Sequence, residues 1–594
     1  MGNQEIMTGN EAVSRGFWES GGIFAASYPG SPTVEILESV KKYSEIEGRW
    51  APNEKVALEM SIGASMAGGR TIVSMKHVGI NIAADPFMTF TQVRTKGGFV
   101  LVVGDDPGLN SSQNEQDSRF WGKFANIPVL EPSNPQEIKD YTKLALNLSE
   151  EFGTPILVKL TTTLCHGRAP VKLEERVEAE VSGFSEDQGR FCMLPPYSNK
   201  QQYFMQERIQ KLRGYNNSTS INTLKEKANT DTLIITSGVS YEYLREAEAN
   251  ASILKLAMVY PLPIEKIQDL AKKYKKIIVI EELMPFIEEI LKTNGIEVEG
   301  KKFFPFTGEL TTEIIRKGLY EAGVLGEKPV INEKNTGIPP RTPMLCAGCP
   351  HRPVFHILKK AKAVVMGDIG CYSLGILEPF EVLKTNISMG ASLGMVQGVA
   401  AILRKSGKPQ PLVAMIGDGT FFHSGMTGMV ELSKTKDNIT VMIMDNRTTA
   451  MTGGQFTPTT GEYLEGKGDH TINIKGILEA FGIKDITVVD QFKYKETKET
   501  ILAAMKREGL SVIITTRPCA LNFKVKEPHY YVDQEICISC RSCIGVNCPP
   551  ISMKQYEGKD KLNSYINADM CVGCSVCSQV CPVGAIKRSQ KEEA

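Results

Sequence analysis

Two closely spaced groups of cysteines at the end of the chain constrain its fold more tightly than any other feature. Eight of the 14 cysteines lie between residue 537 and the end of this 594-residue sequence. The second group has the spacing C-x2-C-x2-C-x3-C-P, which is that of bacterial two-cluster ferredoxins. The first group has four residues, not three, before its C-P cysteine. The two groups are Cys537, Cys540, Cys543 and Cys548, and then Cys571, Cys574, Cys577 and Cys581.

This spacing predicts two [4Fe-4S] clusters with crossed ligands. Three thiolates of a group wrap one cluster, and the cysteine before proline reaches the other. A zinc ribbon is the alternative, because CxxC pairs also bind zinc. However, the eight cysteines form two triplets that are each completed by a C-P cysteine, and this is not the ligand grouping of a zinc site. Such clusters carry single electrons, so an electron source is expected upstream. The predicted sets are Cys537, Cys540, Cys543 and Cys581 for one cluster, and Cys548, Cys571, Cys574 and Cys577 for the other.

Upstream of the tail, short β-branched runs alternate with helical patterns, which is typical of parallel α/β domains. A polar, broken stretch at 171–230 predicts a long connection, and a Pro-rich linker precedes the last α/β block. We therefore expect three α/β blocks and one small appended module. The strand-like runs are 22–30, 70–77, 98–106 and 155–161, then 232–238, 254–262 and 276–282, then 363–370, 411–419, 439–446 and 511–518.

Composition excludes some classes of function. Lys+Arg and Asp+Glu are both 68, so the formal net charge is zero, which argues against nucleic-acid binding. The sequence has no apolar run of the roughly 18 residues that a membrane span needs, and its start lacks a signal-peptide pattern. We expect a cytoplasmic protein with no nucleic-acid or membrane partner, where clustered cysteines more often hold metal than form disulfides.

Two motifs in the third block predict a thiamine diphosphate site. A GDG sequence, Gly417, Asp418 and Gly419, follows one strand, and Asn446 ends the next, with 26 residues between Gly419 and Asn446. Asp418, Asn446 and the backbone carbonyl of Thr448 would bind the Mg²⁺ that bridges the diphosphate. The two glycines let the backbone approach the phosphates. GDG alone also fits an ordinary strand-to-helix turn, and the correctly spaced Asn446 favours thiamine.

Thiamine enzymes also need a carboxylate that contacts the aminopyrimidine ring. The stretch "NEKVALEMSIGASMAGG" (53–69) supplies Glu54 at a helix start, followed by small residues that allow close approach. Glu59 is the competing carboxylate. Glu54 would alternatively be a favourable charge in the first turn of the helix.

These motifs together resemble the thiamine-dependent 2-oxoacid:ferredoxin oxidoreductases, and most closely the α subunits of the indolepyruvate ferredoxin oxidoreductases. The resemblance covers essentially the whole chain, and the longer first cysteine spacing fits that subunit family. It rests on "YPGSPTVEI" (28–36), "NEKVALEMSIGASMAG" (53–68), "MKHVGINIAADP" (75–86), "DDPGLNSSQNEQDSR" (105–119), "LCAGCPHRP" (345–353), the GDG motif, "DNRTTAMTGGQ" (445–455) and the tail.

The resemblance implies an α/β multidomain thiamine diphosphate-binding fold, with parallel sheets flanked by helices, and a C-terminal α+β two-cluster ferredoxin domain. The implied order is a pyrimidine-binding domain (1–175), a connecting segment (176–230), a transketolase-C-like domain (231–335), a pyrophosphate- and Mg-binding domain (336–527) and a ferredoxin-type domain (528–594).

The implied reaction is the oxidative decarboxylation of arylpyruvates (indolepyruvate, phenylpyruvate, 4-hydroxyphenylpyruvate) with coenzyme A, giving aryl-acetyl-CoA and CO2 in aromatic amino acid catabolism. Electrons pass through the [4Fe-4S] clusters to ferredoxin, and a smaller β subunit is expected, with two copies of each chain. Three alternatives stay open: the same chemistry on another 2-oxoacid, a non-oxidative decarboxylase with a vestigial tail, and an electron-transfer subunit for a separate catalytic partner. Eight intact cysteines argue against the second, and Glu54 with Asp418 and Asn446 argues against the third.

The substrate-contacting residues are less clearly marked. In the wider family a Thr in "YPxTP" contacts the substrate carboxylate, and Ser31 occupies that position here. His77 ends a predicted strand and would position substrate or accept a proton, or be structural. Lys76 and Arg119 are candidate anchors for the substrate carboxylate.

A third [4Fe-4S] cluster is also predicted, outside the tail. Some relatives in the wider family hold a cluster with a similar CxGC, GC and PC set. Strand ends of one polarity share a rim in a parallel sheet, so Cys371 and Cys519 should lie near Asp418. The alternative is that these cysteines are buried or cofactor-contacting thiols, since free cysteine is often buried. The closest subunit family is credited with only the two tail clusters, which also favours this alternative. The set is Cys346, Cys349, Cys371 and Cys519, named the proximal cysteines below.

Overall fold

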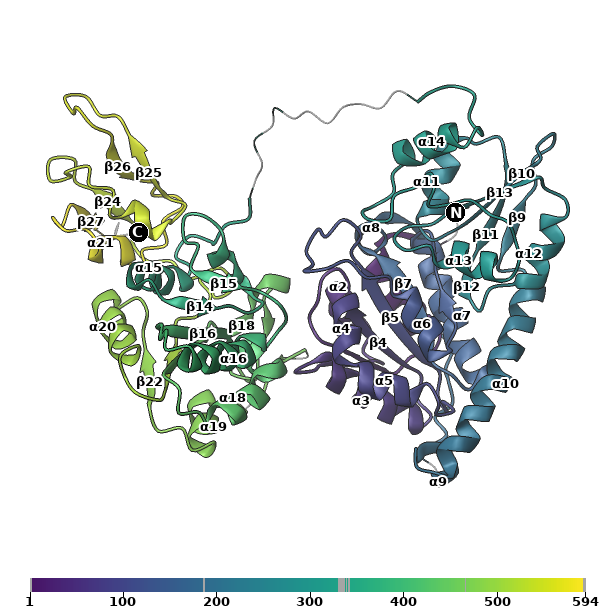
Figure 1. Ribbon diagram of the computed structural model, residues 1–594, viewed down its shortest axis with the longest axis horizontal. Helices are drawn as coiled ribbons and strands as arrows, with labels where there is room; N and C mark the ends of the chain where they lie inside the picture. The colour runs from purple at the N-terminus through teal and green to yellow at the C-terminus, as the bar shows by residue number, and fades with distance from the viewer. Residues whose placement is uncertain are drawn as a thin grey trace. The chain divides into compact units, whose positions relative to one another are not determined.

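The computed structural model describes residues 3–184, 187–329, 337, 339, 342–464, 466–468 and 470–590. The chain divides into two compact units, Met1–Asn335 and Thr336–Ala594. Figure 1 draws the first unit in purple to teal and the second in green to yellow.

The first unit is built on a seven-stranded sheet of order β12-β6-β7-β5-β4-β2-β3. All neighbours are parallel except β12 and β6. Every residue of β4, β5 and β7 is buried, as expected for strands covered by helices on both faces. The strands are β2 (Phe24–Ser27), β3 (Glu47–Trp50), β4 (Thr71–Lys76), β5 (Phe99–Asp105), β6 (Val129–Leu130), β7 (Ile156–Thr161) and β12 (Met258–Tyr260).

Helices flank this sheet, and an antiparallel ribbon of β1 (Gln4–Thr8) and β8 (Arg168–Lys172) lies beside them. The helices are α1 (Gly9–Glu19), α2 (Val34–Val40), α3 (Glu54–Met66), α4 (His77–Ile82), α5 (Ala84–Phe90), α6 (Arg119–Ala125), α7 (Pro135–Phe152) and α8 (Thr162–His166).

A second sheet of the same unit has the order β13-β10-β11-β9, with only β9 antiparallel. Its strands are β9 (Thr223–Lys225), β10 (Thr232–Ser237), β11 (Ser252–Leu256) and β13 (Lys276–Ile280), and its helices are α11 (Ser240–Ala247), α12 (Ile264–Ala271), α13 (Phe286–Thr293) and α14 (Thr312–Glu321).

The segment expected to be an irregular connection contains two helices, α9 (Gln188–Phe191) and the 22-residue α10 (Tyr197–Ser218). One face of α10 is buried with helical spacing, and its polar residues conceal that face in the sequence. The buried residues are Gln201, Met205, Arg208, Ile209, Leu212 and Asn216.

The second unit contains a six-stranded, fully parallel sheet of order β15-β14-β16-β17-β23-β22. The parallel sheets of the two units confirm the α/β prediction. The strands are β14 (Val364–Met366), β15 (Leu383–Thr385), β16 (Leu412–Gly417), β17 (Ile439–Met444), β22 (Ile486–Val489) and β23 (Leu510–Thr515). The helices are α15 (His351–Ala361), α16 (Ala391–Lys405), α17 (Asp418–Thr420), α18 (Met426–Leu432), α19 (Ile474–Ala480) and α20 (Tyr494–Ala504).

The cysteine tail is a small module of two antiparallel ribbons, β24 with β27 and β25 with β26. It packs on the α/β part of its unit, beside α15 (Figure 1). Gln579 accepts a hydrogen bond from the Tyr494 N–H at 2.9 Å and donates to the Phe492 carbonyl at 2.6 Å. The elements are β24 (Tyr530–Val532), β25 (Ile551–Lys554), β26 (Asn563–Ile566), α21 (Val576–Gln579) and β27 (Ile586–Arg588).

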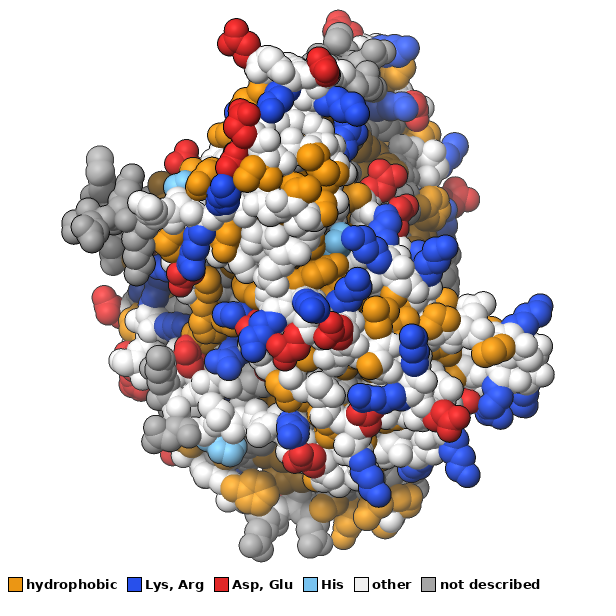
Figure 2. Space-filling view, turned by 90° about the vertical axis from the view of Figure 1, so that its left-hand side faces the viewer, with side chains coloured by type: hydrophobic (Ala, Val, Ile, Leu, Met, Phe, Trp, Pro, Cys, Tyr) orange, Lys and Arg blue, Asp and Glu red, His pale blue; other side chains and the backbone are white. Residues whose placement is uncertain are grey.

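No helix in the described part of the chain is both long and apolar enough to span a membrane. Basic and acidic side chains are interspersed on the face drawn in Figure 2, in keeping with the zero net charge.

Candidate functional site

Three oxygen-bearing groups converge beyond the ends of β16 and β17. One terminal atom of the Asn446 amide lies 3.0 Å from Asp418 Oδ1 and 2.9 Å from the Thr448 carbonyl oxygen. Oxygens at adjacent corners of an octahedral Mg²⁺ site, each about 2.0–2.1 Å from the metal, are roughly 2.9 Å apart. With Asn446 Oδ1 turned inward the three oxygens therefore fit Mg²⁺, whereas an inward amide nitrogen would donate to both of the other oxygens.

The electrostatics of this site also suit a cation. Asp418 is 1% exposed, and Thr457 Oγ1 donates to its Oδ2 at 2.9 Å. Burial, reinforced by the neighbouring Asp445 carboxyl, raises the pKa of Asp418 to about 8. A buried acid beside a second, half-buried acid is costly to ionise unless a positive charge neutralises the pair. Sequence reasoning missed Asp445 and Thr457, although Asp445 directly precedes Asn446.

A glycine is needed where β16 ends. A Cβ added to Gly417 would lie 2.8 Å from Cε1 of Tyr372. The Tyr372 ring thus packs directly on the backbone of the GDG turn, and α17 begins at the next residue, Asp418.

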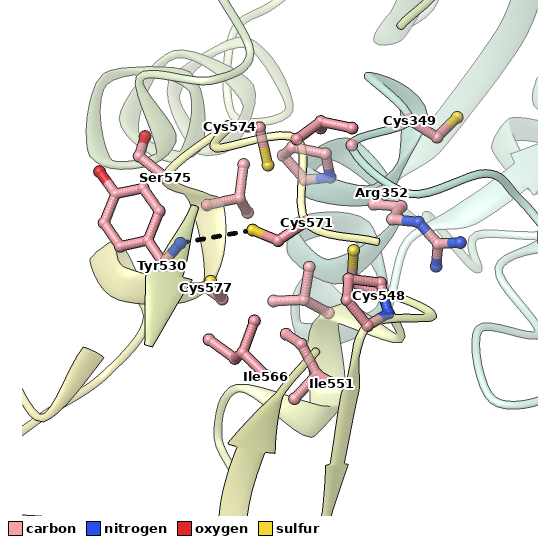
Figure 3. A pocket seen from close by; sticks show the side chains of 16 residues that line it. Cys349, Arg352, Tyr530, Cys548, Ile551, Ile566, Cys571, Cys574, Ser575 and Cys577 are labelled. Atoms are coloured by element: carbon pink, nitrogen blue, oxygen red, sulfur yellow. Dashed lines mark hydrogen bonds between the residues drawn. The ribbon is translucent and has the colours of Figure 1, made fainter. Parts of the chain in front are cut away.

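Two cavities in the tail each contain four of its cysteines. The inner cavity lies against α15 and contains Cys548, Cys571, Cys574 and Cys577 (Figure 3). The outer cavity contains Cys537, Cys540, Cys543 and Cys581. The tail cysteines that line the two cavities correspond to the two crossed sets, with Cys349 also lining the inner one, although no three His, Cys, Asp or Glu side chains of the described residues are grouped as in a metal site. Cys540 is exposed, and the exposed Ile538 and Val583 line the same cavity, so the outer set is the one near the surface.

Backbone N–H groups point at several of these sulfurs. Tyr530 N–H donates to Cys571 Sγ at 3.5 Å, and Ala585 N–H donates to Cys581 Sγ at 3.3 Å. Such bonds stabilise the negative charge of a thiolate-bound cluster. The first cysteine group has one extra residue before Cys548. Within this longer loop Asn547 adopts a left-handed conformation with φ of 52°, which Asn does more readily than most residues.

The thiols of the four proximal cysteines influence one another's pKa. Burial, together with the Cys519 and Cys346 thiols, raises the pKa of Cys371 to about 11. Burial likewise raises the pKa of Cys349, with the thiols of Cys371 and Cys346 as further causes. The Cys519 N–H donates to the Asn446 carbonyl at 3.0 Å, so this set adjoins the Asp418 site.

The proximal cysteines also adjoin the inner cavity. Gly348 has a φ of +64°, and a Cβ added there would lie 2.1 Å from Cγ2 of Val572, in the tail. The Gly348 backbone N–H also opposes the rise that burial causes in the pKa of the Cys548 thiol. The second unit therefore contains one continuous series of sites: the Asp418 site, the proximal cysteines, the inner cavity and the outer cavity.

In the first unit, Glu54 begins α3, and the Asn53 side chain caps the helix by accepting from Val56 N–H at 2.9 Å. Glu54 is 5% exposed, and a Cβ added to Gly79 would lie 2.7 Å from its Oε1. Glu59 instead is exposed and forms an ion pair with Lys55. The structure thus separates a buried carboxylate at the helix start from a solvent-facing one.

Ser31 and Lys76 lie at one edge of the seven-stranded sheet. Ser31 is half-buried, and a Cβ added to the preceding Gly30 would lie 3.2 Å from Cβ of Lys76. Lys76 is the last residue of β4, and its Nζ donates to the Ser111 carbonyl at 2.8 Å. Burial lowers the pKa of Lys76.

His77 and Arg119 are fully enclosed by protein. His77 Nδ1 lies 3.4 Å from the Gly104 carbonyl oxygen and Nε2 lies 3.1 Å from the Asn114 carbonyl oxygen, and burial lowers the pKa of His77. Both carbonyls are acceptors, so the neutral ring can donate to only one of them. Arg119 forms ion pairs with Asp117 and Glu281 and donates to two backbone carbonyls. Its guanidinium is thus a structural link and is not placed to anchor a substrate carboxylate.

Three protein-family models match the chain. They are described as the C-terminal TPP-binding domain of thiamine pyrophosphate enzymes (residues 368–515), the thiamine diphosphate-binding part of pyruvate flavodoxin/ferredoxin oxidoreductases (18–235) and a 4Fe-4S binding domain (564–587). Fold, site and these matches define a thiamine-dependent 2-oxoacid:ferredoxin oxidoreductase, an enzyme of oxidative decarboxylation with iron–sulfur electron transfer.

Similarity to curated proteins extends over the whole chain. Indolepyruvate oxidoreductase subunit IorA of Pyrococcus horikoshii is 37% identical over 100% of this chain and 98% of its own length. The IorA of Archaeoglobus fulgidus is 36% identical over 99% of this chain and 98% of its own length. A solved 2-oxoglutarate:ferredoxin oxidoreductase from Magnetococcus marinus matches 54% of this chain and 65% of its own, at 18% identity and a TM-score of 0.45. The chain belongs to the indolepyruvate oxidoreductase subunit IorA family.

Proposed function

We propose that this chain oxidatively decarboxylates arylpyruvates (indolepyruvate, phenylpyruvate and 4-hydroxyphenylpyruvate), with coenzyme A as acyl acceptor and ferredoxin as electron acceptor. The observation that carries the proposal is the series of adjoining sites in the second unit, from the Asp418 oxygens to the outer cysteines. The name of the relatives, indolepyruvate oxidoreductase, supports the substrate.

The chain's own residues have defined tasks in this proposal. Asp418, Asn446 and the Thr448 carbonyl would hold Mg²⁺, which would neutralise the charge of the diphosphate. Thiamine diphosphate, when bound, supplies the electron sink that decarboxylation of a 2-oxoacid requires. Glu54 shares a proton with the aminopyrimidine ring, and its burial keeps water from competing for that proton. Ser31 offers a hydroxyl to the substrate carboxylate.

His77 holds a fixed position through the backbone carbonyls that face its two ring nitrogens. A ring held in this way orients the backbone around it more readily than it transfers a proton, because a proton on either nitrogen is already directed at a carbonyl. We propose a positioning role for His77 at the end of β4.

The cysteines are proposed to hold three [4Fe-4S] clusters, one on the proximal cysteines and one in each tail cavity. Clusters bound there supply one-electron carriers between the thiamine site and the surface. The proximal cysteines adjoin Asn446, and the outer cavity contains the exposed Cys540. The outer cavity is therefore the proposed exit towards ferredoxin.

A smaller β subunit is the proposed partner, in an assembly with two copies of each chain. The word subunit in the names of the relatives supports a partner chain.

A panel of 2-oxoacids tests the proposal. The anoxically purified complex is assayed with coenzyme A and a viologen dye, and dye reduction should be fastest with arylpyruvates. A preference for pyruvate or 2-oxoglutarate would reject the substrate. Protein that retains its clusters but binds no thiamine diphosphate would instead be an electron-transfer subunit.

A further inference from the structure

A buried arginine lies between the proximal cysteines and the inner cavity. Arg352 is on α15, three residues after Cys349, and is only 2% exposed. It lines the inner cavity together with Cys548 and Cys574. In Figure 3 Arg352 lies beside Cys548, and Cys349 lies above it in the view.

Two of the three guanidinium nitrogens are occupied by the loop that carries Cys346. Nε donates to the Cys346 carbonyl at 3.0 Å, and Nη2 donates to the Leu345 carbonyl. These bonds fix the plane of the guanidinium. Nη1 is buried and has no hydrogen-bond partner among the described residues. A buried charged donor without an acceptor is costly, and native proteins rarely leave one.

The positive charge of Arg352 lies near the sulfurs of both the proximal cysteines and the inner cavity. Burial lowers the pKa of Arg352, and the thiols of Cys548, Cys349, Cys346 and Cys574 oppose that shift. An arginine in such surroundings stays protonated at neutral pH. The groups named as opposing the shift are all cysteines, so deprotonated cysteine sulfur is the counter-charge that these neighbours can supply.

We propose that Arg352 Nη1 donates a hydrogen bond to the iron–sulfur cluster of the inner cavity and that its charge raises the reduction potential of that cluster. The inference rests on the proposed cluster ligation and adds a residue that tunes it. Accepting one electron adds one negative charge to the cluster, and a fixed neighbouring cation stabilises the reduced form more than the oxidised form. No proton needs to move. A higher potential would therefore favour electron transfer from a cluster on the proximal cysteines to the cluster in the inner cavity.

The test is a redox titration of the anoxic holoenzyme, followed by EPR, in wild type and three variants. Arg352→Gln removes the charge, and Arg352→Lys retains it without the planar fork. Arg517→Gln is the matched control. Cys574 also influences the pKa of Arg517, but the Arg517 side chain is 44% exposed and forms an ion pair with Asp490 at 2.7 Å.

Arg352→Gln should lower the midpoint potential of the inner cluster by at least about 59 mV. At a fixed potential this corresponds to a tenfold lower ratio of reduced to oxidised cluster, since one electron is transferred. Arg352→Lys should fall between this value and wild type, and Arg517→Gln should match wild type. Equal shifts in Arg352→Gln and Arg517→Gln, or no shift in either, would overturn the proposal.

A second measurement covers the case in which Arg352→Gln fails to assemble. Wild-type protein labelled with ¹⁵N-arginine should show a weak ¹⁵N coupling to the reduced inner cluster in pulsed EPR, and Arg352→Lys should lose it. Absence of this coupling in wild type overturns the proposal. Both readouts use chemical reduction, so a failure of the 2-oxoacid assay leaves them intact, whereas absence of iron from the cysteine sets refutes the cluster ligation itself.

Discussion

At the residue scale, the proposed Mg²⁺ site gives a first prediction, at Asp418. Asp418→Ala removes one of three converging oxygens and leaves the diphosphate with no properly held cation. We expect Mg²⁺-dependent thiamine diphosphate to be lost, with affinity falling at least 100-fold. Cofactor retained after gel filtration, measured by thiochrome fluorescence, checks this. Thr457→Ala keeps all three oxygens and is the control. Equal retention in Asp418→Ala and wild type would defeat the assignment.

The two carboxylates of α3 give a second prediction at this scale. Glu54→Gln keeps the size of the buried side chain but cannot share a proton with the ring. It should bind thiamine diphosphate normally and lose about 10²–10⁴-fold in kcat, the usual contribution of a positioned proton-transfer group. Glu59→Gln changes an exposed ion pair and should stay active. The opposite pattern in the dye assay would show that Glu59 is the catalytic carboxylate.

Residue types at motif spacings predicted that Asp418, Asn446 and Thr448 lie together, because the ends of adjacent parallel strands meet at one edge of the sheet. Asp445 and Arg352 were not predicted to have a role. Their surroundings are set by strands and loops distant in sequence, so no local pattern indicates that Asp445 sits beside Asp418 or that Arg352 faces the tail. The enclosed environment of His77 has the same origin.

At the scale of elements, the Cys346 loop packs closely on the tail at Gly348. Gly348→Ala should disrupt this packing, because the added Cβ would overlap Val572. We expect a destabilisation of about 1–3 kcal/mol and a lower iron content in the tail. Gly407→Ala is the control, since Gly407 has a φ of +66° but no atom within 4 Å of an added Cβ. If both variants lower the melting temperature equally, strain at positive φ alone explains the effect.

Apolar strands were easier to predict from sequence than the elements between them. Each expected β-branched run contains a strand, because buried parallel strands are continuously apolar. The run at 254–262 splits into β11 and β12, and β12 pairs with β6 of the other sheet, which no local signal reveals. Helix α10 was missed because Gln201, Arg208 and Asn216 are among its buried residues, and burial of polar side chains does not register as apolar periodicity.

At the scale of the whole molecule, the number of clusters is the most accessible prediction. Three cubanes hold about twelve iron atoms per chain, and two hold about eight. We expect about twelve from iron analysis of anoxically purified protein, because the thiols of the proximal cysteines influence one another's pKa and Cys519 adjoins Asn446. Cys371→Ser should reduce the count to about eight without affecting the tail. A wild-type value of about eight would leave the proximal cysteines as thiols.

The order of α/β blocks and tail was predictable from the sequence, since alternating strands and helices and the cysteine spacings are local signals. The adjacency of the Asp418 site, the proximal cysteines and the inner cavity was only partly predictable. The rim of a parallel sheet placed Cys371 and Cys519 near Asp418. The docking of the tail on α15 depends on Val572, Gly348 and Gln579, whose contacts arise only in the folded unit.

The central claim is that one chain couples thiamine chemistry to its own electron carriers, and substrate-driven cluster reduction tests it most directly. Indolepyruvate and coenzyme A are added to the dye-free, anoxic complex while the iron–sulfur absorption is recorded. The account predicts bleaching in wild type and none in Asp418→Ala, with dithionite bleaching both proteins equally. Bleaching that persists in Asp418→Ala, or a wild type that dithionite reduces but no 2-oxoacid does, would contradict it.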